Sequence, residues 1–342
     1  MRILVTGHNG YIGMVMVPML IAEGHEVVGL DSDLFEQCIF DGAVCELPQI
    51  SMRKDIRDIQ ACDLEGCDAV IHLAGLSNDP LGNLNPALTY EINYIASVHL
   101  AKVAKEVGIP RFLFSSSCST YGAAGEDTVD EEATFHPVTP YGHSKVLVEQ
   151  EIAKLEDSNF SPTFLRNATA YGVSPRLRFD LVLNNLVAWA VTTGRVYIKS
   201  DGTPWRPIVH IEDIARAFIA ALNAPREVVH NQAFNVGRNE ENYQIRDLAK
   251  IVEEMIPDCH VEYAEGAEPD KRSYRVDFSK LARTLPEFKP QWNARQGVKQ
   301  LYEAYRKICV CLEDFEGPMY KRIDHVKQLL KSGRLDNTLR WR

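Results

Sequence analysis

The start of the chain constrains the fold more than any other part of the sequence. A short apolar run, Ile3–Thr6, leads directly into Gly7-His8-Asn9-Gly10-Tyr11-Ile12-Gly13, which has the spacing GxxGxxG, and an amphipathic stretch follows from Ile12 to Glu23. Glycines let a chain turn sharply and bring its backbone close to a phosphate, and the helix that follows directs free N–H groups at the negative charge. Three glycines can also form only a turn, but here they lie between a predicted strand and a predicted helix, as a dinucleotide-binding βαβ unit requires.

The first half of the chain alternates apolar runs with helical stretches. Runs that suit buried parallel strands are Ile3–Thr6, Glu26–Leu30, Ala69–Leu73 and Arg111–Ser115, and Asn93–Val107 is a second amphipathic stretch. This pattern predicts an α/β fold with a Rossmann-type doubly wound parallel sheet. The second half predicts one more buried strand at Gln232–Val236. It also predicts a smaller, mixed C-terminal lobe, with a strand at Arg195–Lys199 and helices at Asn242–Met255 and Ser279–Leu285.

Charge and cysteine content narrow the range of partners. The 37 basic and 47 acidic residues give a net charge of −10, which argues against nucleic acid and anionic membrane because both need a positive surface. The sequence shows no secretory signal and no apolar stretch of membrane-spanning length, so a cytoplasmic location is expected. None of the 8 cysteines falls in a CxxC pair or at zinc-finger spacing with histidine, and no metal site is predicted.

An acidic residue ends the second predicted strand. Asp31 follows the glycine turn by about 20 residues, a position from which a carboxylate accepts hydrogen bonds from the ribose hydroxyls of a dinucleotide. Its charge would repel a 2′-phosphate, and no Arg or Lys lies between Arg2 and Arg53 to offset that repulsion. NAD is therefore favoured over NADP as the cofactor. The alternative is that Asp31 only caps the strand.

Two further segments are candidates for the cofactor site. Asp55-Ile56 follows the third strand, where an adenine could pack, although such a pair is also typical of a solvated loop. Leu73-Ala74-Gly75 ends the next strand, and its small residues would let a cofactor lie across the strand ends. Those residues would equally permit close helix packing.

The chemistry-bearing residues lie in the middle of the chain. Tyr141 and Lys145 are four residues apart, which places both on one face of a helix, and an ammonium beside a phenol would lower the phenol pKa so that it serves as a base. A serine-rich run, 115–119, follows an apolar strand, and its Ser117 lies 24 residues before Tyr141. A serine hydroxyl there could hold a substrate oxygen on which charge develops. Alone, the Tyr–Lys spacing could arise by chance and the serine run could be a loop.

Taken together, these segments resemble the extended short-chain dehydrogenases/reductases, the NAD-dependent nucleotide-sugar epimerase and dehydratase family. The resemblance covers roughly residues 1–300. It rests on GHNGYIG, Asp31, Asp55-Ile56, HLAG at 72–75, Asn93, SSSCSTYG at 115–122, YGHSK at 141–145, Arg206 within WRPIVHIED, and FNVG at 234–237.

The resemblance implies a role for each matched residue. Tyr141 would be the base, Lys145 would position and activate it, Ser117 would steady the substrate oxygen, and Asn93 would support the lysine or the helix geometry. The implied cofactor site comprises Gly7, Asn9, Gly10, Tyr11, Ile12, Gly13, Asp31, Asp55, Ile56, Leu73, Ala74, Gly75 and Ser115, with Tyr141 and Lys145. The implied substrate site comprises Ser117, Cys118, Ser119, Thr169, Asn184, Asn185, Arg206 and Arg272. The two arginines would hold the sugar's diphosphate, or else form surface ion pairs.

The chain departs from the family pattern in two places. Cys118 and Ser119 stand where the 4,6-dehydratases carry an Asp-Glu pair, so no carboxylate is available there to eliminate water, and a dehydratase is disfavoured. The family's R-Y-F-N-x-Y-G appears as RNATAYG at 166–172, with Thr169 at the place of a substrate-contacting Asn. The insertion-like segment from Ser174 to Arg178 is expected to supply other contacts.

The function implied is NAD-dependent epimerisation of a nucleotide-diphosphate sugar, most simply at C4 through a transient keto-sugar. A keto-sugar reductase would use the same residues, and a non-catalytic NAD-binding protein would have no chemical reason to keep them all. We expect residues 1–168 and 207–238 to form the NAD-binding domain, 169–206 and 239–306 the nucleotide-sugar lobe, and 307–342 a helical tail of unassigned role. By the resemblance, a homodimer would pair through helices at about 87–106 and 142–156.

Overall fold

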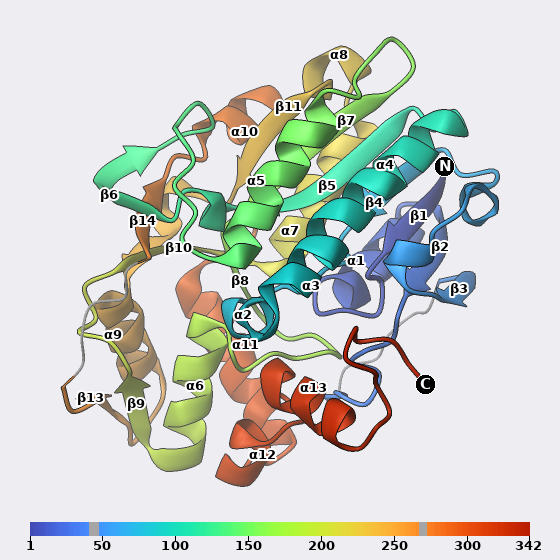
Figure 1. The fold of residues 1–342 in the computed structure, drawn as a ribbon. Helices are drawn as coiled ribbons and strands as arrows, with labels where there is room; N and C mark the ends of the chain where they lie inside the picture. The colour runs from blue at the N-terminus through green and yellow to red at the C-terminus, as the bar shows by residue number, and fades with distance from the viewer. Residues whose placement is uncertain (41–47, 267–271) are drawn as a thin grey trace.

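Seven parallel strands form the central sheet of the protein (Figure 1). The computed structural model describes residues 1–40, 48–266 and 272–342. In spatial order the strands are β11 (Gln232–Val236), β7 (Ser161–Asn167), β5 (Arg111–Ser117), β4 (Ala69–His72), β1 (Arg2–Thr6), β2 (Glu26–Asp31) and β3 (Ile50–Arg53). The chain order reverses between β4 and β1, and open parallel sheets bind ligands at the carboxyl ends of the strands beside such a reversal. The predicted Rossmann-type fold is confirmed.

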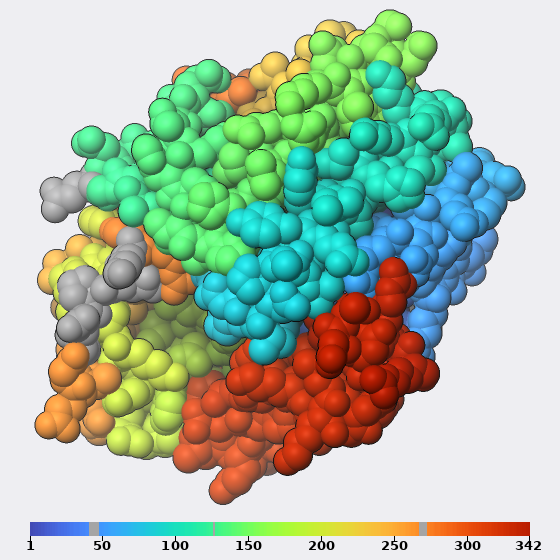
Figure 2. Space-filling model, in the orientation of Figure 1, coloured from blue at the N-terminus to red at the C-terminus, as the bar shows by residue number. Residues whose placement is uncertain are grey.

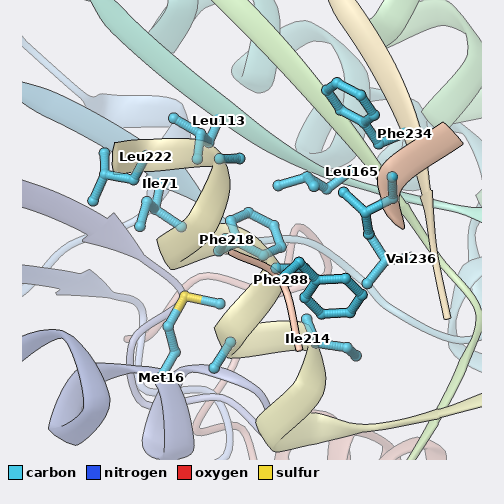
Figure 3. Packing of buried hydrophobic residues seen from close by; sticks show 14 of the residues in the cluster. Met16, Ile71, Leu113, Leu165, Ile214, Phe218, Leu222, Phe234, Val236 and Phe288 are labelled. Carbon is cyan, nitrogen blue, oxygen red and sulfur yellow. The ribbon is translucent and has the colours of Figure 1, made fainter. Parts of the chain in front are cut away.

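Helices cover both faces of this sheet. On one face lie α1 (Gly13–Ala22) and α7 (Ile211–Asn223), and on the other α3 (Pro86–Tyr90), a π-helical turn η3 (Glu91–Ile95), α4 (Ala96–Glu106) and α5 (Pro140–Ala153). Side chains alternate between the faces, so Ile3 and Val5 of β1 pack toward α1 and α7 while Leu4 packs toward α4. Figure 3 shows Phe218 of α7 in the first of these two clusters. Burial on both faces explains why the strands read as continuous apolar runs.

The remaining strands belong to three small sheets. In the first, β10 (Trp205–His210) pairs with β8 (Thr169–Tyr171) on one side and β12 (Asn242–Gln244) on the other. The second pairs β9 (Arg195–Ile198) with β13 (His260–Tyr263), and the third pairs β6 (Ala123–Val129) with β14 (Ser273–Val276). A third hydrophobic cluster joins α6 (Val182–Thr193), α9 (Ile245–Met255) and α11 (Ala294–Lys307). The short helices are α2 (Asp79–Leu84), α8 (Arg226–Val229) and α10 (Ser279–Thr284). No helix within the described residues is long and apolar enough to cross a membrane.

The end of the chain turns back onto the central sheet. It contains α12 (Leu312–Glu316), which packs against α6, and α13 (Arg322–Lys331); the red end of the chain after α12 lies beside the blue β2 and β3 region in Figures 1 and 2. The indole N–H of Trp341 donates a hydrogen bond to the carbonyl of Ser32 at 2.6 Å. The last residues are therefore fastened to the loop that follows β2.

One predicted helix was placed too early in the sequence. Residues 242–244 form strand β12, and α9 begins only at Ile245. Gln244 and Asp247 form a reciprocal capping box, which starts the helix after Gln244. The Asn242 side chain also bonds the backbone N–H and carbonyl of Val276, both at 2.9 Å, and this holds residue 242 in the extended chain.

Candidate active site

A cavity of about 860 Å³ opens at the carboxyl ends of β1, β4 and β5. All the residues predicted to bind the cofactor line this cavity: Gly7, Asn9, Gly10, Tyr11, Ile12, Gly13, Asp31, Asp55, Ile56, Leu73, Ala74, Gly75, Ser115, Tyr141 and Lys145. The smaller sheets and the C-terminal segment complete its walls. The volume lies in the upper part of the range of about 300–1,000 Å³ that is typical of ligand pockets.

The glycine turn is shaped for a phosphate. Gly7 has φ +75°, and a Cβ there would lie 2.7 Å from the backbone nitrogen of Ala74. A Cβ on Gly13 would lie 2.4 Å from the carbonyl oxygen of Gly7. These positions exclude any side chain, so the backbone and the N-terminus of α1 are the groups presented to the cavity. The geometry fits the pyrophosphate of a dinucleotide.

The end of β2 supplies an acidic wall. The Asp31 carboxylate accepts the backbone N–H groups of Asn9 at 3.1 Å and Asp33 at 2.9 Å, and burial raises its pKa. The Asn9 amide in turn donates to Asp33 at 2.6 Å. Carboxylates at this place accept from ribose hydroxyls and oppose a 2′-phosphate. The residues present thus fit NAD.

The catalytic candidates meet where β5 ends and α5 begins. Thr139 caps α5 by accepting the N–H of Gly142 at 3.2 Å, which fixes the first turn of the helix that carries Tyr141. The Ser117 hydroxyl lies near the Tyr141 phenol and acts to lower its pKa. Lys145, one turn further along, donates to the Ser115 carbonyl at 2.7 Å and lies 4.5 Å above the centre of the Phe114 ring.

The structure corrects the electrostatic prediction for this pair. Burial lowers the pKa of Lys145 to about 7, although the negative charge of Glu149 acts to raise it. Burial also raises the pKa of Tyr141 to about 12, although the Ser117 hydroxyl acts to lower it. The Lys145 ammonium is held by Ser115 and lies 5.7 Å from the centre of the Tyr141 ring, so it does not lower the phenol pKa by itself. Activation of Tyr141 needs a further positive charge in the cavity.

The buried lysine predicts a pH dependence of stability. Between pH 7 and 10.5 the unfolded chain binds a proton at Lys145 that the folded chain does not, so the free energy of unfolding rises with pH across this window. Lys145→Met removes the titrating group, and with it this pH dependence of the free energy of unfolding. We expect the difference in stability between wild type and variant to grow in favour of wild type from pH 7.5 to pH 9, measured by urea unfolding at both values. A difference that stays constant with pH would contradict the lowered pKa.

The substrate candidates Ser117, Ser119, Thr169, Asn185, Arg206 and Arg272 also line the cavity. The Ser119 hydroxyl is buried and makes no hydrogen bond within the described residues. Arg206 is only 8% exposed and donates to the carbonyls of Trp205 and Arg272. Arg272 pairs with Asp79 at the cavity wall.

Three predicted residues lie behind the cavity wall. Cys118 is buried in the core and its thiol donates to the Arg166 carbonyl at 3.1 Å. Asn184 is fully buried, accepting from the N–H of Gly172 and donating to the Tyr11 hydroxyl at 3.1 Å each. Asn93 bonds both backbone groups of Leu76 and donates to Ser144, the residue before Lys145, at 3.3 Å. These side chains shape the site without facing it.

The sequence did not reveal several wall residues. Arg178 donates to the Ser77 hydroxyl at 3.1 Å and pairs with Asp180 at 2.8 Å. Burial alone would raise the pKa of Asp180, but Arg178 outweighs it and lowers that pKa. The unusual segment that ends at Arg178 was the available signal. Tyr274, Asp79 and the C-terminal residues carried none, because they approach the cavity from distant parts of the chain.

No cluster of three or more His, Cys, Asp or Glu that could hold a metal occurs in the ranges 1–40, 48–266 and 272–342. The described cysteines carry free thiols, and Cys45 lies outside those ranges.

Comparison with known proteins identifies the family of the chain. Residues 3–237 match the NAD dependent epimerase/dehydratase family. The UDP-glucose 4-epimerase of Bacillus subtilis is 26% identical over 88% of this chain and 94% of its own length. That of Streptococcus mutans is 30% identical over 86% and 93%. The UDP-glucose 4-epimerase of Thermotoga maritima, solved with UDP-glucose, superposes with a TM-score of 0.78 at 25% identity, covering 91% of this chain and all of that one. The chain belongs to the NAD-dependent epimerase/dehydratase family of extended short-chain dehydrogenases/reductases, with NAD as its cofactor.

Proposed function

We propose that the protein epimerises the sugar of a nucleoside-diphosphate sugar at C4, through a transient keto-sugar. The observation that carries the proposal is that Tyr141 and Ser117 line the same cavity as the glycine turn, where β5 ends, and that the Ser117 hydroxyl is close enough to act on the pKa of the Tyr141 phenol. Two hydroxyls at one end of a dinucleotide cavity suit removal of a proton from a substrate hydroxyl. The relatives named above support a UDP-sugar as the substrate class.

Tyr141, Ser117 and Lys145 would each have a separate role in the reaction. NAD, when bound, supplies a hydride acceptor, a hydride donor and the positive charge of its oxidised ring. Tyr141 takes the proton from the sugar hydroxyl and later returns it, while Ser117 holds the same oxygen as it becomes a carbonyl. Lys145 holds the end of β5 through the Ser115 carbonyl and keeps a proton close to the phenol. The opposite stereochemistry results when the keto-sugar presents its other face before it is reduced.

The diphosphate would be held at the other side of the cavity. Arg206 and Arg272 line it there, joined to each other through the Arg272 carbonyl. A planar guanidinium suits a diphosphate because it offers two parallel N–H donors.

Loss of water is disfavoured as the reaction. Elimination needs a carboxyl group beside the catalytic tyrosine, and Ser117 is followed by a buried thiol and by Ser119. The carboxylates Asp79 and Asp180 line the cavity, but each is paired with an arginine.

Incubation of the purified protein with UDP-sugars, without added cofactor, tests the proposal. The expected result is the C4 epimer by NMR with no accumulation of reduced nicotinamide by absorbance. Stoichiometric NADH with an oxidised sugar, or turnover only with added reduced cofactor, would instead establish a keto-sugar oxidoreductase. A deoxy keto-sugar would establish a dehydratase.

A further inference from the structure

The C-terminal segment 317–342 forms a wall of the cavity at its cofactor end. Lys321, Arg322, Ile323 and Leu339 line the same cavity as the glycine turn and Asp31. We propose that this segment is part of the cofactor site and that Arg322 binds the pyrophosphate of NAD. The proposal rests on NAD binding and is independent of which reaction follows.

The segment is bonded to residues that follow Asp31 and Asp55 in the sequence. Beyond the bond from Trp341 to Ser32, the imidazole of His325 donates to the Leu34 carbonyl at 3.1 Å. Further along, the Thr338 carbonyl accepts from Arg57 at 2.9 Å, and Arg340 pairs with Asp58. Each contact falls on residues that follow β2 or β3, so the segment spans the adenosine side of the cavity.

Arg322 is a buried cation that forms no ion pair within the described residues, and the Asp180 carboxylate that acts on it is paired with Arg178. Arg322 is 4% exposed, and its guanidinium carbon lies 4.1 Å from the centre of the Phe35 ring. One terminal nitrogen donates to the Arg176 carbonyl at 3.0 Å, whereas the other, Nη1, is buried and makes no hydrogen bond within the described residues. Burial lowers its pKa to about 10. An unpaired buried donor on a charged group is costly, and an anionic ligand in the cavity would remove that cost.

The surroundings of Arg322 indicate the cofactor's phosphates as the anion. Phe35, against which it lies, follows Asp31 by four residues, on the side where the ribose of the adenosine is expected. Arg322 also begins α13, so the positive end of that helix faces the cavity with the side chain. The substrate's diphosphate has its own arginines, Arg206 and Arg272, beside Tyr274 and Asp79. The glycine turn and the start of α13 would then hold the pyrophosphate between two helix N-termini.

Calorimetric titration of the full-length protein, freed of bound nucleotide, tests this assignment with NAD⁺, ADP-ribose and UDP as ligands. For Arg322→Gln we expect NAD⁺ and ADP-ribose to bind about 10-fold or more weakly, since a hydrogen bond to a charged group is lost, while UDP binding is unchanged. Lys327→Gln removes one charge from an exposed position of the same helix and should bind all three ligands as wild type does.

Arg322→Lys covers the case in which the glutamine variant does not fold. The lysine keeps the positive charge but lacks the two parallel N–H donors of the guanidinium. We therefore expect ADP-ribose affinity to fall about three-fold or more, with UDP affinity unchanged. Unchanged ADP-ribose affinity in a folded Arg322 variant would overturn the proposal. Weakened UDP binding with unchanged ADP-ribose binding would assign Arg322 to the substrate and overturn it as well.

Discussion

Tyr141→Phe is expected to lower kcat by about 10²–10⁴-fold while the protein retains NAD. The variant removes the phenol hydroxyl beside Ser117, and with it the group proposed to move the substrate proton. The ring itself stays, so the packing of α5 against the sheet should be preserved. Turnover of the UDP-sugar that proves to be the substrate, with NAD content measured after acid release, gives both quantities.

A matched control separates chemistry from structure. Tyr263→Phe makes the same chemical change on a side chain that is 47% exposed, and it should leave both kcat and NAD content as in wild type. If Tyr141→Phe kept kcat within a few-fold of wild type, the assignment of Tyr141 as the base would be wrong. If it lost NAD as well, its effect would have to be assigned to the cofactor site.

Arg166→Met is expected to destabilise the fold by about 3–5 kcal/mol, because it leaves a buried carboxylate without its cation. Arg166 and Glu149 are each 5% exposed and are joined by a hydrogen bond of 2.7 Å between Nη2 and Oε2. The guanidinium also donates to the Tyr121 hydroxyl at 3.0 Å and to the Glu131 carbonyl at 2.9 Å. Urea unfolding at pH 7 measures the loss.

The double variant Arg166→Met with Glu149→Met tests the reason for that loss. Replacing both charges by apolar groups removes the uncompensated carboxylate, so it should recover much of the stability lost in the single variant. A double variant no more stable than Arg166→Met would show that the hydrogen bonds to Tyr121 and Glu131, rather than the buried charge, carry the effect.

Local sequence patterns were enough to predict strands β1, β2, β4, β5 and β11 of the central sheet, the glycine turn and the Tyr141–Lys145 helix. Each of these is a local pattern with one physical solution. A strand buried on both faces must be apolar throughout, a backbone that approaches a phosphate must lack side chains, and residues four apart on a helix must share a face. These segments therefore show their structure within a window of a few residues.

Tertiary structure alone decided which predicted side chains face the cavity. Cys118 and Ser119 are neighbours in one tight turn. Because β7 lies behind that turn, the Cys118 thiol donates to the Arg166 carbonyl of β7, whereas Ser119 lines the cavity. The pKa values of Tyr141 and Lys145 were set the same way, since burial by distant segments outweighs the interaction between the two side chains.

The position of the C-terminal segment was also decided by tertiary structure alone. Leu339 and Arg322 reach the end of the cavity that the glycine turn and Asp31 line, and the contacts of Trp341 with Ser32 and of His325 with Leu34 join residues about 300 apart in sequence. No local pattern marks such a contact, because an amphipathic helix near the end of a chain can bury its apolar face on any surface of matching shape. The packing of the whole molecule selects that surface.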